Sequence, residues 1–202
     1  MKDLKITLIC SISLFLGACV TLPNSFVKDG DVLVHKPTAT RYPKKIQGWN
    51  LLEGATDKVD NEIAASASYR QASFSKAFNA DFIPTASVYI LSSEKSNGLQ
   101  ILQKRLKAQI PNAIQERQET LKTPNGTTTA IVYKHLAGVA VNSLISQAFE
   151  TESWLIQSPT QKQVAYWVTV AKTDKDRESI PTDFLARYNE GLKADAKTSI
   201  AQ

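Results

Sequence analysis

The sequence contains few of the residues that most often carry catalysis, metal binding or covalent cross-links. Its 202 residues include only two cysteines, Cys10 and Cys19, and two histidines, His35 and His135. No cysteine follows position 19, so residues 20–202 can form neither a disulfide nor a thiolate metal site, and they hold no cysteine nucleophile. The folded part must therefore gain its stability from packing, which a chain of this length can supply.

The patterns of known catalytic and cofactor sites are also missing. There is no H-E-x-x-H zinc motif, no G-x-S-x-G nucleophile motif and no glycine-rich phosphate loop. A serine hydrolase would need a histidine as its base. His35 stands beside Pro37 in a segment that we expect to be solvated, and His135 ends a predicted strand, where we expect a partly buried, hydrogen-bonded ring. We predict no cofactor and no metal. The net charge of +5 comes without an aromatic-interleaved basic motif, so we expect no nucleic-acid partner.

The clearest motif lies at the N-terminus. Lys2 and Lys5 precede an apolar run, residues 6–16, which is long enough for the core of a signal peptide but too short to span a bilayer as a helix. The residues Leu16-Gly17-Ala18-Cys19 follow directly and resemble the lipobox of bacterial lipoprotein precursors. The small residues before the cysteine suit a protease that needs an extended backbone. The alternative to a lipobox is an apolar N-terminus in which a cysteine follows by chance.

The lipobox resemblance implies a processed and lipid-anchored protein. Residues 1–18 would be a removed signal peptide, Cys19 would carry a diacylglycerol on its sulfur, and an acyl chain such as palmitate is often added to the new amino group. Two or more acyl chains hold a protein stably at a membrane, whereas one does so only marginally. The implied location is the bacterial cell envelope, facing the periplasm. The outer membrane is favoured over the inner, because Val20 rather than aspartate follows the cysteine.

After the cysteine we expect a tether and then a single domain. Residues 19–44 contain three prolines and lack sustained apolar periodicity, which predicts a flexible tether. The exception is the apolar stretch at residues 32–34, which could add a short strand. Residues 45–195 are predicted to form one domain, and residues 196–202 a frayed tail.

Periodicity within the domain predicts both strands and helices. A leucine stripe over residues 97–110, with Ser96 or Asn97 as the cap and Pro111 as the stop, predicts one helix, and residues 182–194 predict another. The predicted strands are residues 49–53, 62–70, 85–92, 113–123, 128–135, an ambiguous segment from about 147, and 164–171. We therefore expect an α+β domain with a largely antiparallel sheet of about six strands and two main helices packed on it.

This order of elements resembles the PsbP-like fold and, within it, the DcrB-type bacterial lipoproteins. The resemblance lies in the opening Gly48-Trp49 strand, the Ala86–Leu91 strand that leads into the first helix, the Asn125-Gly126 hairpin, and the closing strand and helix at Val164–Leu192. It implies a small sheet covered by helices that serves as an accessory or binding module. No site residues transfer, because no motif matches position by position.

Three tryptophans and several carboxylates are the remaining candidates for a site. Trp49, Trp154 and Trp167 could line a ligand groove or a protein interface, or they could belong to the core. The apolar segment 137–141 leaves the same choice between an exposed partner-binding loop and a buried linker. A hydrolase that uses carboxylates alone would need two of them about 5–10 Å apart in a cleft. The residues considered for such a pair are Asp57, Asp60, Glu94 and Glu150. The cluster Asp57, Asp60 and Glu62 does not match a calcium loop.

These observations favour one class of function over another. We expect a lipid-anchored accessory protein of the cell envelope that binds a protein partner or a small apolar ligand without catalysis. The alternative is an envelope hydrolase that uses carboxylates only.

Overall fold

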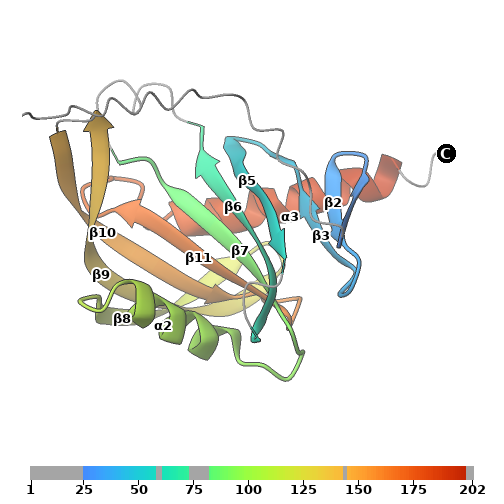
Figure 1. Cartoon of the computed structure of the whole chain (residues 1–202), viewed down its shortest axis with the longest axis horizontal. Helices are drawn as coiled ribbons and strands as arrows, with labels where there is room; N and C mark the ends of the chain where they lie inside the picture. The colour runs from blue at the N-terminus through green and yellow to red at the C-terminus, as the bar shows by residue number, and fades with distance from the viewer. Residues whose placement is uncertain (1–24, 58–60, 73–81, 143–144, 199–202) are drawn as a thin grey trace, which may run out of the picture.

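The computed structural model of the protein describes residues 25–57, 61–72, 82–142 and 145–198. Within them the strands form two antiparallel sheets, and two helices flank the larger sheet (Figure 1). The smaller sheet has the order β1-β2-β3, formed by β1 (Phe26–Asp29), β2 (Val32–His35) and β3 (Thr40–Pro43). The larger sheet has the order β4-β5-β6-β7-β11-β10-β9-β8. Its strands are β4 (Lys45–Ile46), β5 (Trp49–Asp57), β6 (Ile63–Gln71), β7 (Thr85–Leu91), β8 (Ile114–Thr123), β9 (Gly126–Asn142), β10 (Ile145–Gln157) and β11 (Val164–Ala171).

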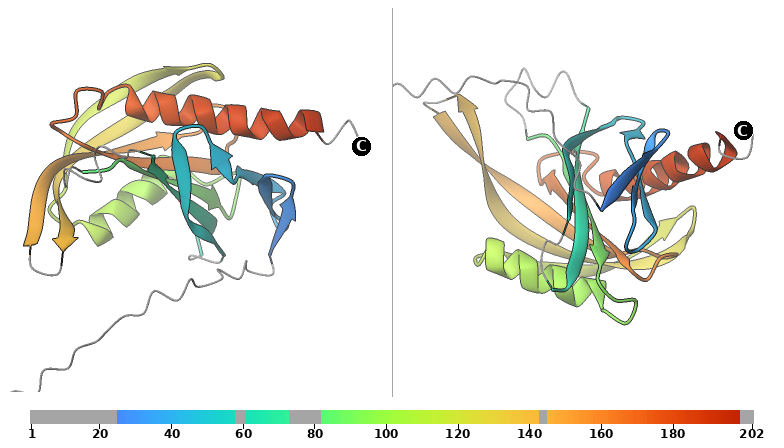
Figure 2. Two further views of the ribbon diagram at one scale, coloured as in Figure 1. Left: turned by 90° about the horizontal axis from the view of Figure 1, so that it is seen from above. Right: turned by 45° about the vertical axis from the view of Figure 1, so that its right-hand side comes forward.

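The larger sheet separates two hydrophobic clusters. Successive side chains of a strand point to opposite faces, and the central strands are apolar at both sets of positions. One face carries α3 (Ile180–Thr198) and the three-stranded sheet, and the other carries α2 (Gly98–Gln109). Figure 2 shows α3 and α2 on opposite sides of the sheet. We refer to these as the α3 face and the α2 face.

Helix α2 begins and ends where its sequence predicts. The Asn97 side chain accepts a hydrogen bond from the backbone N–H of Gln100 at 3.2 Å, which satisfies one of the amides left open at a helix start. The helix ends at Gln109, two residues before Pro111. Leu102 and Leu106 are fully buried against the sheet. The predicted leucine stripe is therefore the face that holds α2 in place.

The hairpin between β8 and β9 is present, but its turn differs from the expected type. We expect a type I′ turn from the Asn125-Gly126 pair. The register instead pairs Thr123 with Gly126, so the two turn residues are Pro124 and Asn125. The proline ring fixes φ near −65°, which excludes a type I′ turn. Gly126 follows the turn with a φ of 126°, a conformation that favours glycine.

The predicted architecture is confirmed in outline and wrong in the number of strands. An antiparallel sheet with two main helices is present, but the larger sheet has eight strands, not about six, and a second sheet accompanies it. The segment 137–141 is not a linker, because β9 continues through it to Asn142. Helix α3 also extends to Thr198, beyond the predicted end of the domain.

Ordered strands also occupy most of the segment for which the sequence predicts a tether. Phe26, Leu33 and Tyr42 of the three-stranded sheet are buried in the α3-face core. His35, expected to be solvated, is 1% exposed, and its ring lies 4.9 Å from that of Phe26. The tether prediction therefore does not apply to residues 25–44. Strands of four residues are too short to show clear alternation, which explains the error; residues 19–24 lie outside the described part of the chain.

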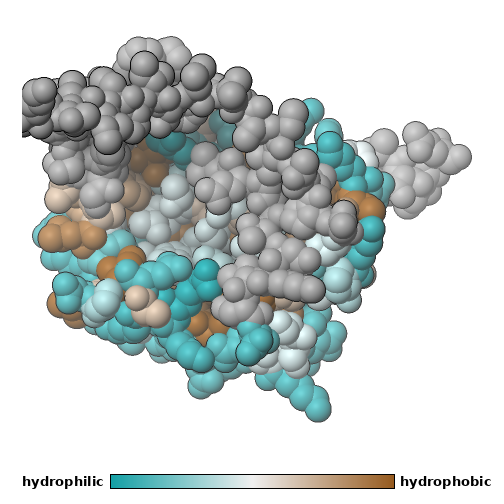
Figure 3. Space-filling model, viewed as in Figure 1, coloured by the Kyte–Doolittle hydropathy of each residue, from teal (hydrophilic) through white to brown (hydrophobic). Residues whose placement is uncertain are grey.

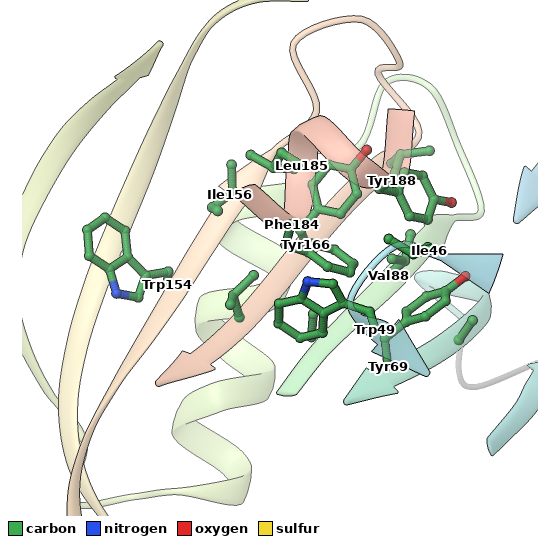
Figure 4. Packing of buried hydrophobic residues seen from close by; sticks show 14 of the residues in the cluster. Ile46, Trp49, Tyr69, Val88, Trp154, Ile156, Tyr166, Phe184, Leu185 and Tyr188 are labelled. Atoms are coloured by element: carbon green, nitrogen blue, oxygen red, sulfur yellow. The ribbon is translucent and has the colours of Figure 1, made fainter. Parts of the chain in front are cut away.

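Buried tyrosine hydroxyls connect the three-stranded sheet to the larger one. Tyr69 of β6 donates a hydrogen bond to the carbonyl of Pro43 at 2.9 Å, and Tyr188 of α3 donates one to the carbonyl of Arg41 at 3.1 Å. Both rings belong to the aromatic cluster of the α3-face core, which Figure 4 shows around Phe184. Tyr42 is equally buried, but its hydroxyl has no hydrogen-bond partner.

We predict that Tyr69→Phe lowers the free energy of unfolding by about 1–2 kcal/mol, because it leaves the buried Pro43 carbonyl without its donor. Tyr42→Phe is the matched control: it removes a buried hydroxyl that makes no hydrogen bond, so stability should stay the same or rise. Urea unfolding of both variants measures the difference. Equal losses in the two variants would contradict the assigned role of the Tyr69 hydroxyl.

Candidate functional site

The three tryptophans considered as a binding surface do not lie together. Trp49 and Trp154 belong to the α3-face core, where Trp49 packs edge-on against Phe184 with ring centroids 4.8 Å apart (Figure 4). Trp167 lies on the opposite, α2 face. All three are at most 8% exposed. Of the three, only Trp167 donates a hydrogen bond to a cluster of buried polar side chains, whereas Trp154 stacks on the guanidinium of Arg117.

That cluster, which we call the His135 network, lies on the α2 face of β9, β10 and β11. The hairpin register places Thr151 opposite His135, and the pairing of β10 with β11 places Ser153 opposite Thr169. His135 Nε2 is 2.8 Å from Ser153 Oγ, and the indole N–H of Trp167 donates to the same oxygen at 2.8 Å. Thr151 and Ser153 are completely buried, so each polar group depends on the others for hydrogen bonds.

The hydrogen bonds of the network fix its proton positions. Thr151 donates to the backbone carbonyl of His135 at 3.0 Å, so its Oγ1 is free to accept from His135 Nδ1, also 3.0 Å away. The Leu136 carbonyl, 3.4 Å from the same nitrogen, is a second acceptor. We therefore assign the proton of the neutral ring to Nδ1. Nε2 then accepts from Ser153, whose oxygen accepts from Trp167 and lies 3.2 Å from Thr169 Oγ1.

The network favours a neutral histidine. Burial lowers the pKa of His135 below its ordinary value of about 6.5, and the hydrogen bond to the Leu136 carbonyl opposes this only in part. The contact between Ser153 and His135 has the atom pair of a serine–base dyad, but hydroxyl and carbonyl oxygens, and no carboxylate, contact the other ring nitrogen. Because Ser153 is fully buried, its oxygen is also closed to a substrate. The arrangement is suited to holding the sheet together.

The surface around the network is of intermediate polarity. Ser68 and Ser87 continue the hydroxyl groups across β6 and β7, with their oxygens 3.1 Å apart. In Figure 3 the area above α2 on this face is mostly pale, the colour of residues of intermediate hydropathy. Beside α2, a hollow of about 500 Å³ is lined in part by Glu62, Ile101 and Arg105. Its mixed lining makes it a modest candidate for a small ligand.

A second polar cluster lies on the α3 face, around a buried carboxylate. Glu152 is 1% exposed and accepts a hydrogen bond from Arg117 at 3.0 Å, while Arg177 Nε lies 3.6 Å away. The Arg117 guanidinium also contacts Glu119 and stacks 5.0 Å from the Trp154 ring. Burial alone lowers the pKa of Arg117, but its hydrogen bonds to Glu152 and Glu119 raise the pKa above the ordinary value. The two arginines compensate the charge of Glu152, which makes this cluster an ion-pair network within the fold.

The carboxylates considered for a hydrolase do not converge among the described residues. Glu94 lies beside Gln157 at one end of β10, whereas Glu150 lies seven residues away along that strand, which corresponds to roughly 23 Å at the usual rise. Glu150 is half-exposed and paired with Lys134 and Lys172. Asp57 ends β5, and Asp60 lies outside the described residues. No group of three histidine, cysteine or acidic residues in the described part of the chain could hold a metal ion.

The sequence by itself does not identify Thr151, Ser153 and Thr169 as members of this network. The one feature of the sequence that could have indicated a buried polar cluster is the presence of small hydroxyl residues within strands that are otherwise apolar on both faces. Their contact with His135 depends on the register of β9 against β10, which no local pattern reveals.

Comparisons with protein-family models, with curated proteins and with solved structures find no match to the chain. In the described ranges, no helix has the length and apolar character needed to cross a membrane.

We predict that the free energy of unfolding declines as the pH falls from 8 towards 5, partly because of His135. Its folded pKa lies below the unfolded value of about 6.5, so the unfolded chain binds the proton first. The stability present above pH 6.5 is therefore lost as the pH falls through the folded pKa. Urea unfolding at several pH values measures the slope, which should be shallower in His135→Gln. An NMR titration that places the His135 pKa at or above 6.5 would contradict this account.

Proposed function

We propose that this chain is a bacterial lipoprotein, anchored in the cell envelope through lipid on Cys19, and that its folded domain is a non-catalytic accessory module. In this proposal the domain faces the periplasm, with the outer membrane favoured, and binds a protein partner or a small apolar ligand. The observation that carries the proposal is the sequence Leu16-Gly17-Ala18-Cys19 placed directly after an apolar run of signal-peptide length.

The chemistry of the domain supports a binding role. The contact of Ser153 with His135 is enclosed within a neutral hydrogen-bond network. Glu94 lies near Gln157 at the end of β10, roughly 23 Å along that strand from Glu150. The buried Glu152 is compensated by two arginines. Among the described groups, Ser153, Glu150 and Glu152 therefore have structural partners, and Glu94 lies far from Glu150.

The arrangement of the elements also supports the finer proposal of a PsbP-like fold. The sheet carries helices on both faces, β7 leads into α2, a hairpin joins β8 to β9, and β11 leads into α3. Under this proposal the domain belongs with modules that assist other components of a membrane or envelope.

We predict that Cys19→Ser shifts the protein out of the lipid-anchored state. With no sulfur to receive the diacylglycerol, the variant should not incorporate labelled palmitate, and it should keep residues 1–18 and so migrate as a larger species. Metabolic labelling and mass spectrometry of cells that express the two forms measure this. Palmitate incorporation by the variant equal to that of the wild type would rule out Cys19 as the lipidation site.

The partner prediction needs a separate experiment in intact cells. A membrane-permeable amine crosslinker should join the wild-type protein to a specific envelope protein, identified by mass spectrometry. The crosslinker has amines to react with on several sides of the domain, because Lys104, Lys122 and Lys193 lie on three different elements. Adducts only with abundant bystanders, in equal yield for an unrelated lipoprotein carried as control, would contradict a protein partner.

A further inference from the structure

The β9–β10 hairpin continues beyond the rest of the sheet. The last pairing of β8 with β9 is Ile114 with Lys134, and the last pairing of β11 with β10 is Ala171 with Thr151. Among the described residues, 136–142 and 145–150 pair only with each other. We call these two stretches, without Glu150 at their base, the ribbon. Figure 1 shows it projecting from the sheet at the upper left, and at about 3.3 Å per residue it extends roughly 20 Å.

The ribbon differs from the rest of the chain in charge. Residues 136–149 contain no Asp, Glu, Lys, Arg or His, whereas charged residues make up 21% of the whole sequence. At its base Leu136 is 69% exposed, as is the nearby Ile114 of β8. Figure 3 shows hydrophobic patches at the left of the molecule, where Figure 1 places β9 and β10. Charge returns at Lys134 and Glu150, whose side chains form an ion pair of 3.4 Å.

The described part of the chain begins close to Cys19 in the sequence. Strand β1 starts at Phe26, and only the five residues Val20–Asn24 lie between the cysteine and the first described residue, Ser25. The six residue steps from Cys19 to Ser25 span at most about 20 Å when fully extended. A lipid on Cys19 would therefore hold the domain within that distance of the bilayer, much closer than a tether of residues 19–44 would.

We propose that the ribbon inserts into the surface of the bilayer that holds Cys19, with its uncharged residues at the boundary between head groups and acyl chains. This inference rests on the proposed lipid anchor. The extended length of residues 19–24 and the length of the ribbon are similar, so both can meet one bilayer. In the left view of Figure 2, α3 runs along the upper side of the molecule and the ribbon reaches the lower left. The blue three-stranded sheet lies below the C-terminal part of α3, which it contacts through Tyr188.

The chemistry of the ribbon suits this shallow position. Its outer backbone groups have no strand partner among the described residues, so deep insertion into hydrocarbon would be costly. At the interface, water and lipid head groups can satisfy them, while apolar side chains enter the acyl region as those of interfacial helices do. The ion pair of Lys134 and Glu150 at the base of the ribbon has to stay among the lipid head groups or in water, which limits how deeply the ribbon can insert.

Single introduced cysteines test this inference directly, because the mature chain would have no other free thiol. The full chain is purified from membranes and reconstituted into vesicles of phosphatidylethanolamine and phosphatidylglycerol. A polarity-sensitive fluorophore is attached at Leu136→Cys or Val139→Cys, with Glu190→Cys on the exposed side of α3 as the matched control. We expect the ribbon labels to emit at shorter wavelength and to be quenched several-fold more by spin-labelled lipids than the control label.

The outcomes separate the inference from the proposed anchor. Labelling of the parent protein without an introduced cysteine would show a free thiol and overturn the anchor itself. Vesicle-bound protein whose ribbon labels are quenched no more than the Glu190 label would overturn insertion while leaving the anchor intact. Ribbon labels that are open to water in vesicles but shielded in intact cells would also overturn it, since a protein partner and not lipid would then cover the ribbon.

Discussion

Strands β10 and β11 impose the constraint on which the rest of this structure depends. They lie inside the larger sheet, and β11 and residues 151–156 of β10 are buried on both faces, so alternate residues must serve two different cores. Trp154 and Ile156 face α3, while Leu155 between them faces α2. A shift of one residue in their register would exchange the two sets. The positions of both helices therefore follow from this pairing.

The same constraint explains the two polar clusters. β10 carries Glu152 on the α3 face and Ser153 on the α2 face, both almost completely buried. A buried charge requires an opposite charge, which Arg117 and Arg177 supply to Glu152. A buried hydroxyl requires hydrogen-bond partners, which His135 and Trp167 supply to Ser153. Each cluster therefore supplies the partners that one buried polar residue of β10 requires.

The parts of the fold that sequence predicts are those in which the pattern and the structure are both local. The alternation in Val164–Ala171 and the leucine stripe of residues 97–110 identify β11 and α2 almost to the residue. Of the three-stranded sheet, the sequence anticipates only a short strand at residues 32–34, which is β2. The other two strands could not be predicted, because they have four residues each and bury only part of their side chains. The contact of His135 with Ser153 could not be predicted, since it joins residues 18 positions apart through a register that the sequence leaves ambiguous near residue 145.

The larger sheet has two kinds of free edge in this region: strand β8 and the edges of the ribbon. Strand β8 is an edge strand with Glu116, Arg117, Glu119 and Lys122, and such charges oppose pairing with a foreign strand. The ribbon has free edges too, yet residues 136–149 carry no charge and no proline. A two-stranded hairpin is only marginally stable in water by itself. The charged edge is compatible with exposure to solvent, whereas the uncharged ribbon is suited to a setting in which something covers it. Under the proposed lipid anchor on Cys19, residues 19–24 would hold the domain within about 20 Å of a bilayer, and the nearest apolar phase would then be the membrane itself.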